Sequence, residues 1–149
     1  MREVLETVVY ESSDGVATVT LNRPERMNAL SSAMMGDLER VFFDIARRDP
    51  LQCLILTGAG GRAFCAGADI RERAGASPRG VATYVELDRT RRLFRVIEQF
   101  ERPTIAAIDG VALGGGLELA LCCDLRIGSP AARVGLTELR LGAIPAAGG

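Results

Sequence analysis

Histidine, lysine and tryptophan are absent from the 149 residues of this chain. Because there is no histidine, the chain itself offers no Ser-His or Cys-His nucleophile and no histidine ligand for a metal. Because there is no lysine, all 18 basic residues are arginines, and the lysines of phosphate-binding P-loops and of Schiff-base enzymes are missing as well. These absences narrow the chemistry that the chain can perform by itself.

A long hydrophobic run and a strong net charge are also missing. No apolar segment approaches the roughly 20 residues of a membrane-spanning helix, and the start of the chain, MREVLETVVYES, lacks the apolar region of a secretory signal. The net charge is −1 and the pI about 5.6, so nothing global attracts nucleic acid or an anionic membrane. We expect one cytoplasmic domain over residues 1–149, with no nucleic-acid or membrane partner.

The cysteines are few and do not form a motif. They are Cys53, Cys65, Cys122 and Cys123; none makes a C-x-x-C pair, and all stand in apolar surroundings. We expect buried free thiols in a reducing compartment. A metal site is not expected, because histidine and paired cysteine spacing are both missing.

Hydrophobic periodicity and turn signals predict the order of helices and strands. Two β-rich segments, 8–12 and 16–22, flank the hairpin signal Ser13-Asp14-Gly15. The other expected elements are a helix over 32–48 capped by Ser31 or Ser32, a strand over 54–57, a loop over 58–69, a linker over 74–80, a helix over 81–100, a strand over 104–109, a short helix to about residue 123 and a strand over 124–128. Short buried strands that alternate with helices predict an α/β fold with parallel pairing.

Two patterns suggest nucleotide or nucleic-acid binding, and both are weak. Residues 58–63 fit the dinucleotide pattern G-x-G-x-x-A, but the following residues 64–67 do not continue the helix that this pattern requires. The helix over 81–100 is rich in arginine but lacks interleaved exposed aromatic residues, so a solvated face explains it better than RNA binding.

Two glycine-containing segments are the best candidates for a site. In residues 63–70, small residues let a ligand approach the backbone, and a helix beginning near Asp69 would leave the amides around Ala68 free. In residues 108–118, three successive glycines precede a helix and again free backbone amides. Two such donors that converge make an oxyanion hole.

Two glutamates lie in apolar surroundings. Glu118 stands in the first turn of the short helix after the glycines, and Glu138 stands in Gly135-Leu136-Thr137-Glu138-Leu139. Each alone is more often structural, for example as a partner of the helix dipole. Together they are the arrangement of two carboxylates that share a site and divide acid and base roles.

Five stretches, in this order along the chain, resemble the enoyl-CoA hydratase/isomerase (crotonase) superfamily. They are Leu21-Asn22-Arg23-Pro24 with Asn28-Ala29-Leu30, Ala63–Ile70, Ile105–Gly110, Ala112–Asp124 and Gly142–Pro145. The resemblance implies an α/β fold, a crotonase-like spiral of ββα units with mostly parallel buried strands, and acyl-CoA thioester substrates. Residues 1–149 would be the core domain without the C-terminal helical region of the family.

The resemblance also implies roles for individual residues. The amides of Ala68 and Gly115 would form an oxyanion hole that stabilises a thioester enolate. Glu118 and Glu138 would hold a water, with Glu118 mainly as the base and Glu138 supplying the proton to the α-carbon, so that water adds across the 2,3-double bond of an enoyl-CoA. The substrate-binding residues would be Ala66 and Ile70 along the CoA and acyl path, Asp69, Gly114, and Arg26 as a candidate for a CoA phosphate. No cofactor is implied, since coenzyme A is part of the substrate.

The resemblance leaves alternatives open. Many isomerases of the family keep only one glutamate, so the pair favours a hydratase, but an enoyl-CoA delta-isomerase uses the same enolate. Residues 102–124 are also similar to the branch that hydrates methylglutaconyl-CoA. RNA binding, known in that branch with a lysine-rich helix, is not expected because the helix over 32–48 has no lysine. Complete family members are longer and form trimers, often paired as hexamers, so a homotrimer or hexamer is expected for the complete chain. An inactive truncated fragment is the remaining alternative to an active enzyme.

Overall fold

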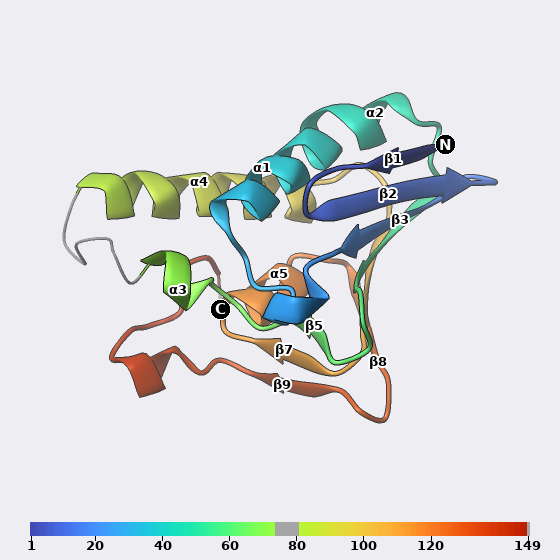
Figure 1. Ribbon diagram of the computed structural model, residues 1–149. Helices are drawn as coiled ribbons and strands as arrows, with labels where there is room; N and C mark the ends of the chain where they lie inside the picture. Colours follow the sequence, from blue (N-terminus) through green and yellow to red (C-terminus); the bar gives the residue numbers. More distant parts are fainter. Residues whose placement is uncertain (74–80, 149) are drawn as a thin grey trace.

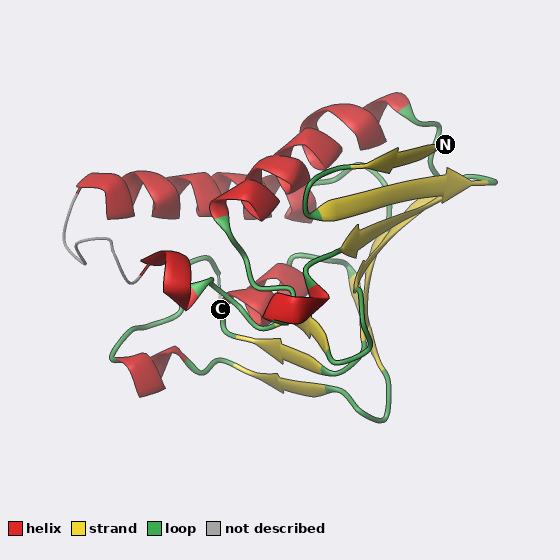
Figure 2. Cartoon of the chain, in the orientation of Figure 1, coloured by secondary structure: helices red, strands yellow, loops and turns green. Residues whose placement is uncertain are grey.

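The strands of the chain form two sheets. In the computed structural model, which describes residues 1–73 and 81–148, one sheet has the order β1-β2-β3-β4-β6-β8 and the other the order β5-β7-β9 (Figures 1 and 2). The strands are β1 (Arg2–Val4), β2 (Val8–Ser13), β3 (Val16–Leu21), β4 (Cys53–Gly58), β5 (Ala63–Cys65), β6 (Thr104–Ile108), β7 (Val111–Leu113), β8 (Leu125–Gly128) and β9 (Arg133–Gly135).

The predicted hairpin and the first predicted helix are both present. Strands β2 and β3 pair antiparallel around Asp14 and Gly15, whose φ angles of 52° and 80° require a residue that tolerates the left-handed region. Ser31 caps the helix, because its side chain accepts a hydrogen bond from the Met34 amide. The helix is continuous but not uniform. It consists of α1 (Ser32–Arg40), the π-helical turn η2 (Val41–Ile45) and α2 (Ala46–Arg48).

Helices α1 and α4 (Val81–Glu98) run across one side of the larger sheet (Figure 1). Arg89 of α4 donates to both carboxylate oxygens of Glu39 in α1, at 2.8 and 2.7 Å, which fixes one helix to the other. The fully buried large side chains come from β2, β3, β4, β5, α1, η2 and α4: Tyr10, Leu21, Met34, Leu38, Phe42, Ile45, Leu54, Leu56, Phe64, Leu93, Phe94 and Ile97. This core holds the layers together.

The chain spirals between the two sheets. Strands β4, β6 and β8 enter the larger sheet in turn, and each is followed by a strand of the smaller sheet, β5, β7 or β9. The helices after them are α3 (Ile70–Arg73) with α4, then α5 (Gly115–Leu121), then the 3-10 helix η3 (Glu138–Leu141). From β3 to β8 and within the smaller sheet, every pairing between the described strands is parallel. The predicted α/β fold with ββα repeats is therefore confirmed.

Several local expectations were wrong or incomplete. The loop expected over 58–69 contains β5. Strands β1, β7 and β9 were not predicted, because each is only three residues long. The short buried strands expected over 54–57 and 104–109 are β4 and β6. Fully buried residues alternate with half-buried ones along them, so only one face of each strand is fully buried. Val85 of α4 is exposed. The predicted linker over 74–80 lies outside the described residues. In the described part of the chain, no helix is both long and apolar enough to cross a membrane.

Asp124 joins the beginning of β8 to the beginning of β6. Its Oδ2 accepts hydrogen bonds from the amide and the hydroxyl of Thr104, at 2.7 and 2.9 Å, and these bonds lower the pKa of the carboxyl. A carboxyl with a lowered pKa stabilises the fold at pH values above its unfolded pKa of about 3.9. This stabilisation is lost as the pH falls through the pKa of the folded state. We expect Asp124→Asn to reduce the free energy of unfolding at pH 7 by about 1 kcal/mol.

The pH dependence of this loss distinguishes the carboxylate from simple packing. In urea melts, the difference between the wild type and Asp124→Asn should shrink as the pH falls below about 4 and through the lowered pKa of the folded carboxyl, because protonation makes Asp124 neutral like asparagine. A difference that stayed constant between pH values of about 7 and 3 would contradict the assignment.

Candidate active site

Three strands of the smaller sheet end at the same place. Strands β5, β7 and β9 are parallel neighbours, so their carboxyl ends lie at one edge of the sheet. The segments that leave this edge are 66–69 after β5, 114–115 after β7 and 136–138 after β9. The Gly114 amide donates to the Gly135 carbonyl at 2.8 Å, which joins the second of these segments to the end of β9. Both predicted glycine segments and Glu138 therefore meet.

The backbone amides of Ala68 and Gly115 are neighbours at this edge. A Cβ atom on Gly115 would lie 3.9 Å from the Ala68 nitrogen, and a Cβ atom on Gly67 would lie 3.4 Å from the Gly115 nitrogen. Within residues 1–73 and 81–148, neither amide donates a hydrogen bond to another residue. Two adjacent N–H groups that keep their donors free can together hold one oxyanion. We call Ala68 and Gly115 the amide pair.

Two glycines permit this close approach. Gly67 has a φ of 93°, and a Cβ atom there would lie 2.7 Å from the Leu113 carbonyl oxygen. At Gly116 a Cβ atom would lie 2.2 Å from the Cys65 carbonyl oxygen, so only glycine lets α5 pack directly on β5. The amide pair depends on both contacts, because they set the distance between the two segments.

Glu118 points its carboxylate toward the amide pair from α5. The residue is 5% exposed, and its Oε2 lies 3.9 Å from the Cβ position of Gly115. Its Oε1 accepts a hydrogen bond of 2.8 Å from the Ala147 amide. Arg91 of α4 fixes the segment before Ala147 by donating to the Ala146 carbonyl at 2.7 Å. Glu118 also borders a hollow of about 330 Å³ between α4 and α5.

Glu138 approaches the same glycine turn from the first turn of η3. Its Oε1 lies 3.1 Å from the Cβ position of Gly114. Both carboxylate oxygens are buried, and neither has a hydrogen-bond partner among the described residues. A buried carboxylate without partners costs folding free energy, so its presence calls for a functional explanation. The two glutamates thus lie beside adjacent glycines, Glu138 at Gly114 and Glu118 at Gly115.

The other predicted site residues are distributed around this centre. Gly114 is buried with a φ of 51°, and Ala66 is half-buried, its amide donating to Met27 at 3.0 Å. Ile70 is exposed at the start of α3, and Arg26 is exposed in the 3-10 turn η1 (Pro24–Arg26). Both side chains are exposed and therefore open to a ligand. Their predicted contacts with the substrate remain predictions.

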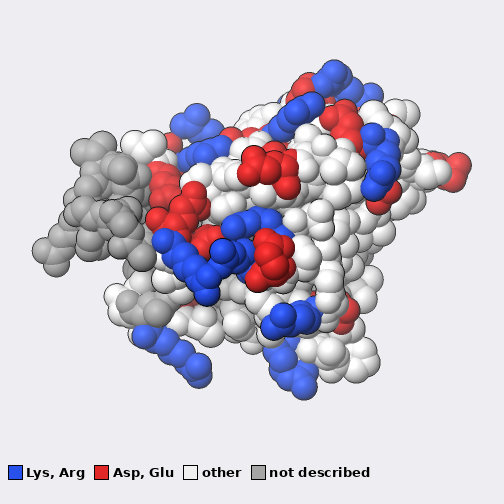
Figure 3. Space-filling model, viewed as in Figure 1, with Lys and Arg blue, Asp and Glu red and all other residues white. Residues whose placement is uncertain are grey.

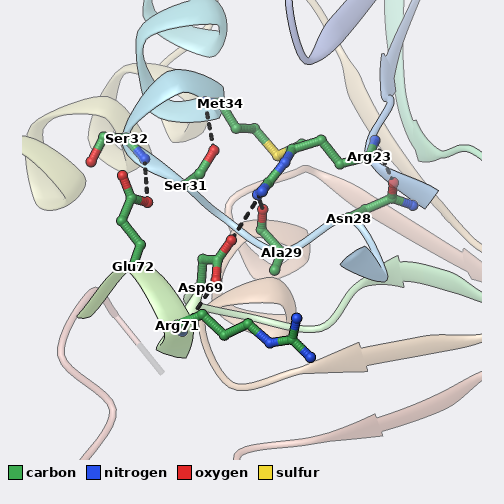
Figure 4. A network of polar contacts seen from close by, with 9 residues as sticks. All are labelled: Arg23, Asn28, Ala29, Ser31, Ser32, Met34, Asp69, Arg71 and Glu72. Atoms are coloured by element: carbon green, nitrogen blue, oxygen red, sulfur yellow. Dashed lines mark hydrogen bonds and ion pairs between the residues drawn. The ribbon is translucent and has the colours of Figure 1, made fainter. Parts of the chain in front are cut away.

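Asp69 is held by Arg23, a residue that the sequence marked only as part of a motif (Figure 4). The Arg23 Nη2 donates to Asp69 Oδ2 at 3.0 Å, and the Arg71 amide donates to Asp69 Oδ1 at 3.2 Å. Burial raises the pKa of the Asp69 carboxyl, but the bonds from Arg23 and from the backbone outweigh it, and the pKa lies below its usual value. The pair is therefore ionic at neutral pH. A side chain 46 residues away in sequence could not have been matched to Asp69 without the fold.

The remaining reactive groups lie away from the amide pair or are inactive as nucleophiles. Burial raises the pKa of the Cys65, Cys122 and Cys123 thiols to about 12, so they are protonated at neutral pH. All four cysteines are free, but Cys53 and Cys122 are only half-buried. On the face shown in Figure 3, basic and acidic side chains are intermingled. Among the described residues, no three side chains gather as metal ligands.

Comparison with known proteins identifies the family. The sequence model of the enoyl-CoA hydratase/isomerase family matches residues 11–149, and the chain belongs to this family. It is 47% identical over 137 residues to the putative enoyl-CoA hydratase/isomerase YngF of Bacillus subtilis, covering 92% of this chain and 52% of that protein. It is 41% identical over 145 residues to a short-chain-enoyl-CoA hydratase of Clostridium acetobutylicum, covering 97% and 55%.

The fold of the family is shared as well. A crystal structure of an enoyl-CoA hydratase from Bacillus anthracis superimposes with a TM-score of 0.89 at 40% identity, over 95% of this chain and 55% of that one. The chain therefore spans about half the length of the relatives that it matches. The two predicted glycine segments and both glutamates lie within the matched residues.

Proposed function

We propose that the protein to which this chain belongs is an enoyl-CoA hydratase. The observation that carries this proposal is the buried carboxylate of Glu138, which has no hydrogen-bond partner among the described residues and lies beside the same glycine turn as Glu118 and the amide pair. A polar site that leaves acceptors and donors free is suited to a polar ligand that satisfies them. Relatives named short-chain-enoyl-CoA hydratase and crotonyl-CoA hydratase support a short unsaturated acyl thioester as the substrate.

The proposed reaction uses four groups of the chain. The amides of Ala68 and Gly115 donate to the thioester oxygen, which becomes negatively charged as the enolate forms. Glu118 accepts a proton from water while the water oxygen bonds to C3 of the enoyl group. Glu138 takes up a proton when the substrate is bound and gives it to C2, and the enolate returns to a thioester. One O–H bond of water and the C2–C3 π bond are lost, and one C–O and one C–H bond are gained. Glu118 then releases the proton that it accepted, which balances the proton that Glu138 took up and gave to C2.

Hydration of crotonyl-CoA tests the proposal directly. We expect the absorbance of the conjugated enoyl thioester to fall, with a product heavier by one water in the mass spectrum and a kcat within the range of about 1–10³ s⁻¹. The protein should be assayed in the longest form that contains this chain. A 3-enoyl-CoA serves as the comparison substrate, because an isomerase would instead convert it to the conjugated thioester and raise the absorbance. Isomerisation without hydration by a folded protein would reject the hydratase assignment.

A further inference from the structure

Arg23 connects two segments that border the amide pair. Its Nη1 donates to the Ala29 carbonyl at 2.8 Å, and its Nη2 donates to Asp69 Oδ2 at 3.0 Å (Figure 4). The side chains of Arg23 and Asp69 are only 19% and 12% exposed, so solvent screens this ion pair less than a surface pair. One guanidinium thus spans from the segment before α1 to the segment before α3.

Ala68 directly precedes Asp69, one of the two residues that Arg23 binds. The Leu30 amide donates to the Gly67 carbonyl at 2.8 Å, and the Asp69 amide donates to the Leu30 carbonyl at 2.9 Å. The backbone on both sides of Ala68 is therefore bound to Leu30, while the Ala68 amide itself stays free. Arg23 binds a neighbour of each bonded segment: Ala29, which precedes Leu30, and Asp69, which follows Ala68.

The Asp69 carboxylate forms the second set of bonds that hold the Ala68 peptide. Its Oδ1 accepts from the Arg71 amide at 3.2 Å, so the same side chain binds the beginning of α3 and the guanidinium. The Glu72 side chain of α3 in turn accepts from the Ser32 amide at 3.0 Å (Figure 4). The peptide of Ala68 is thus held through backbone bonds on one side and through Asp69 on the other.

On the basis of the proposed function, we propose that Arg23, acting through Asp69, is a positioning residue that aims the Ala68 amide at the thioester oxygen. Both bonded nitrogens of the guanidinium face protein groups, so Arg23 acts on the amide and not on the substrate. Arginine is required at this site because its planar fork reaches two acceptors at fixed angles, which a lysine ammonium does not.

A loosened amide affects the transition state more than the bound substrate. Oxyanion donors act mainly where negative charge develops, and a displacement of about 1 Å can cost about 10²-fold in rate. We expect Arg23→Gln and Asp69→Asn each to lower kcat by about 10- to 100-fold with KM within about 3-fold of the wild type. The double variant should lose no more than either single one, because both remove the same connection.

The experiment compares these variants with Arg23→Lys and with the control Arg40→Gln. Arg40 forms an exposed ion pair with Glu3 at 3.3 Å, so its loss removes an arginine–carboxylate pair outside the site. The assays are crotonyl-CoA hydration and the near-ultraviolet absorbance of bound acetoacetyl-CoA, whose enolate reports the oxyanion donors without any proton transfer by the glutamates. Thermal melts establish whether each variant is folded. If Arg23→Gln does not fold, Arg23→Lys and Asp69→Asn decide the result.

Three outcomes separate this inference from the proposed function. It is supported if folded variants lose both kcat and the bound enolate while Arg40→Gln keeps both. It is overturned if a folded Arg23→Gln variant keeps the wild-type kcat, or loses kcat while the bound enolate is unchanged; hydration by the wild type then leaves the proposed function intact. If the wild type neither hydrates crotonyl-CoA nor binds the enolate, both proposals fail.

Discussion

Glu138→Gln is expected to lower kcat for crotonyl-CoA hydration by at least about 10²-fold and, at the same time, to make the protein more stable. The loss of rate follows from removing the group that we propose as proton donor to C2. The gain in stability follows from the fold, because both carboxylate oxygens of Glu138 are buried without a partner among the described residues. Replacing a charge that nothing compensates by a neutral amide should raise the free energy of unfolding by about 1–3 kcal/mol.

The other glutamate provides the comparison. Glu118→Gln should reduce kcat by a similar factor, again about 10²-fold or more. The free energy of unfolding of this variant should differ little from that of the wild type, because the glutamine oxygen can still accept the hydrogen bond from the Ala147 amide. Kinetics and thermal melts of the two variants therefore give the same result for activity and different results for stability.

Glu11→Gln is the matched control for both variants. Glu11 is an exposed residue of β2 in a surface ion pair with Arg2, so its neutralisation should leave kcat unchanged and alter stability by less than about 1 kcal/mol. A Glu138→Gln variant with full activity would exclude Glu138 from the reaction. A Glu138→Gln variant that is inactive and also destabilised would show that the carboxylate has a structural partner.

Gly116→Ala is expected to lower both stability and activity strongly, although alanine in a helix is normally more favourable than glycine by about 1 kcal/mol. A Cβ atom at this position would lie 2.2 Å from the Cys65 carbonyl oxygen, which belongs to the backbone of β5 and cannot rotate away. Strand β5 and helix α5 must therefore separate, and the amide pair separates with them. We expect a loss of about 3 kcal/mol or more in the free energy of unfolding, and about 10²-fold in kcat where the variant still folds.

Gly36→Ala distinguishes this steric effect from helix propensity. Gly36 also lies in a helix, α1, but a Cβ atom there meets only the end of the Arg89 side chain, at 3.3 Å. The change should leave kcat unaltered and shift stability by no more than about 1 kcal/mol. Far-UV circular dichroism melts and the hydration assay measure both quantities for both variants. Equal behaviour of Gly36→Ala and Gly116→Ala would contradict the packing argument.

The sequence alone predicted those parts of the fold that have a local signal. The β2–β3 hairpin, the Ser31 cap and the long helices follow from turn residues, capping preference and periodicity, and all three are present. Strands β5, β7 and β9 were missed because three residues are too short to show alternation. Their pairing is set by the spiral as a whole, which no single segment encodes.

The candidate site likewise combines residues that the sequence could identify with contacts that only the fold reveals. Glu118, Glu138 and the glycine turns could be selected from the sequence because carboxylates and glycines in apolar segments are unusual. Which of the three successive glycines must lack a side chain could not be predicted, since the contact of Gly116 is with a carbonyl of another strand. The Arg23–Asp69 pair and the bond from Ala147 to Glu118 join residues far apart in the chain, and only the folded arrangement brings them together.

The spiral also determines when the site can exist during folding. Strand β3 pairs with β4 some 37 residues later, as in Val16 with Cys53, and β4 pairs with β6 across 50 residues, as in Leu54 with Thr104. Chains dominated by such distant pairings fold slowly, because each loop must close before its contacts stabilise it. The amide pair needs β5 and β7 side by side, and Glu138 needs β9 next to them. We therefore expect a refolding chain to form its helices before the groups proposed for catalysis come together.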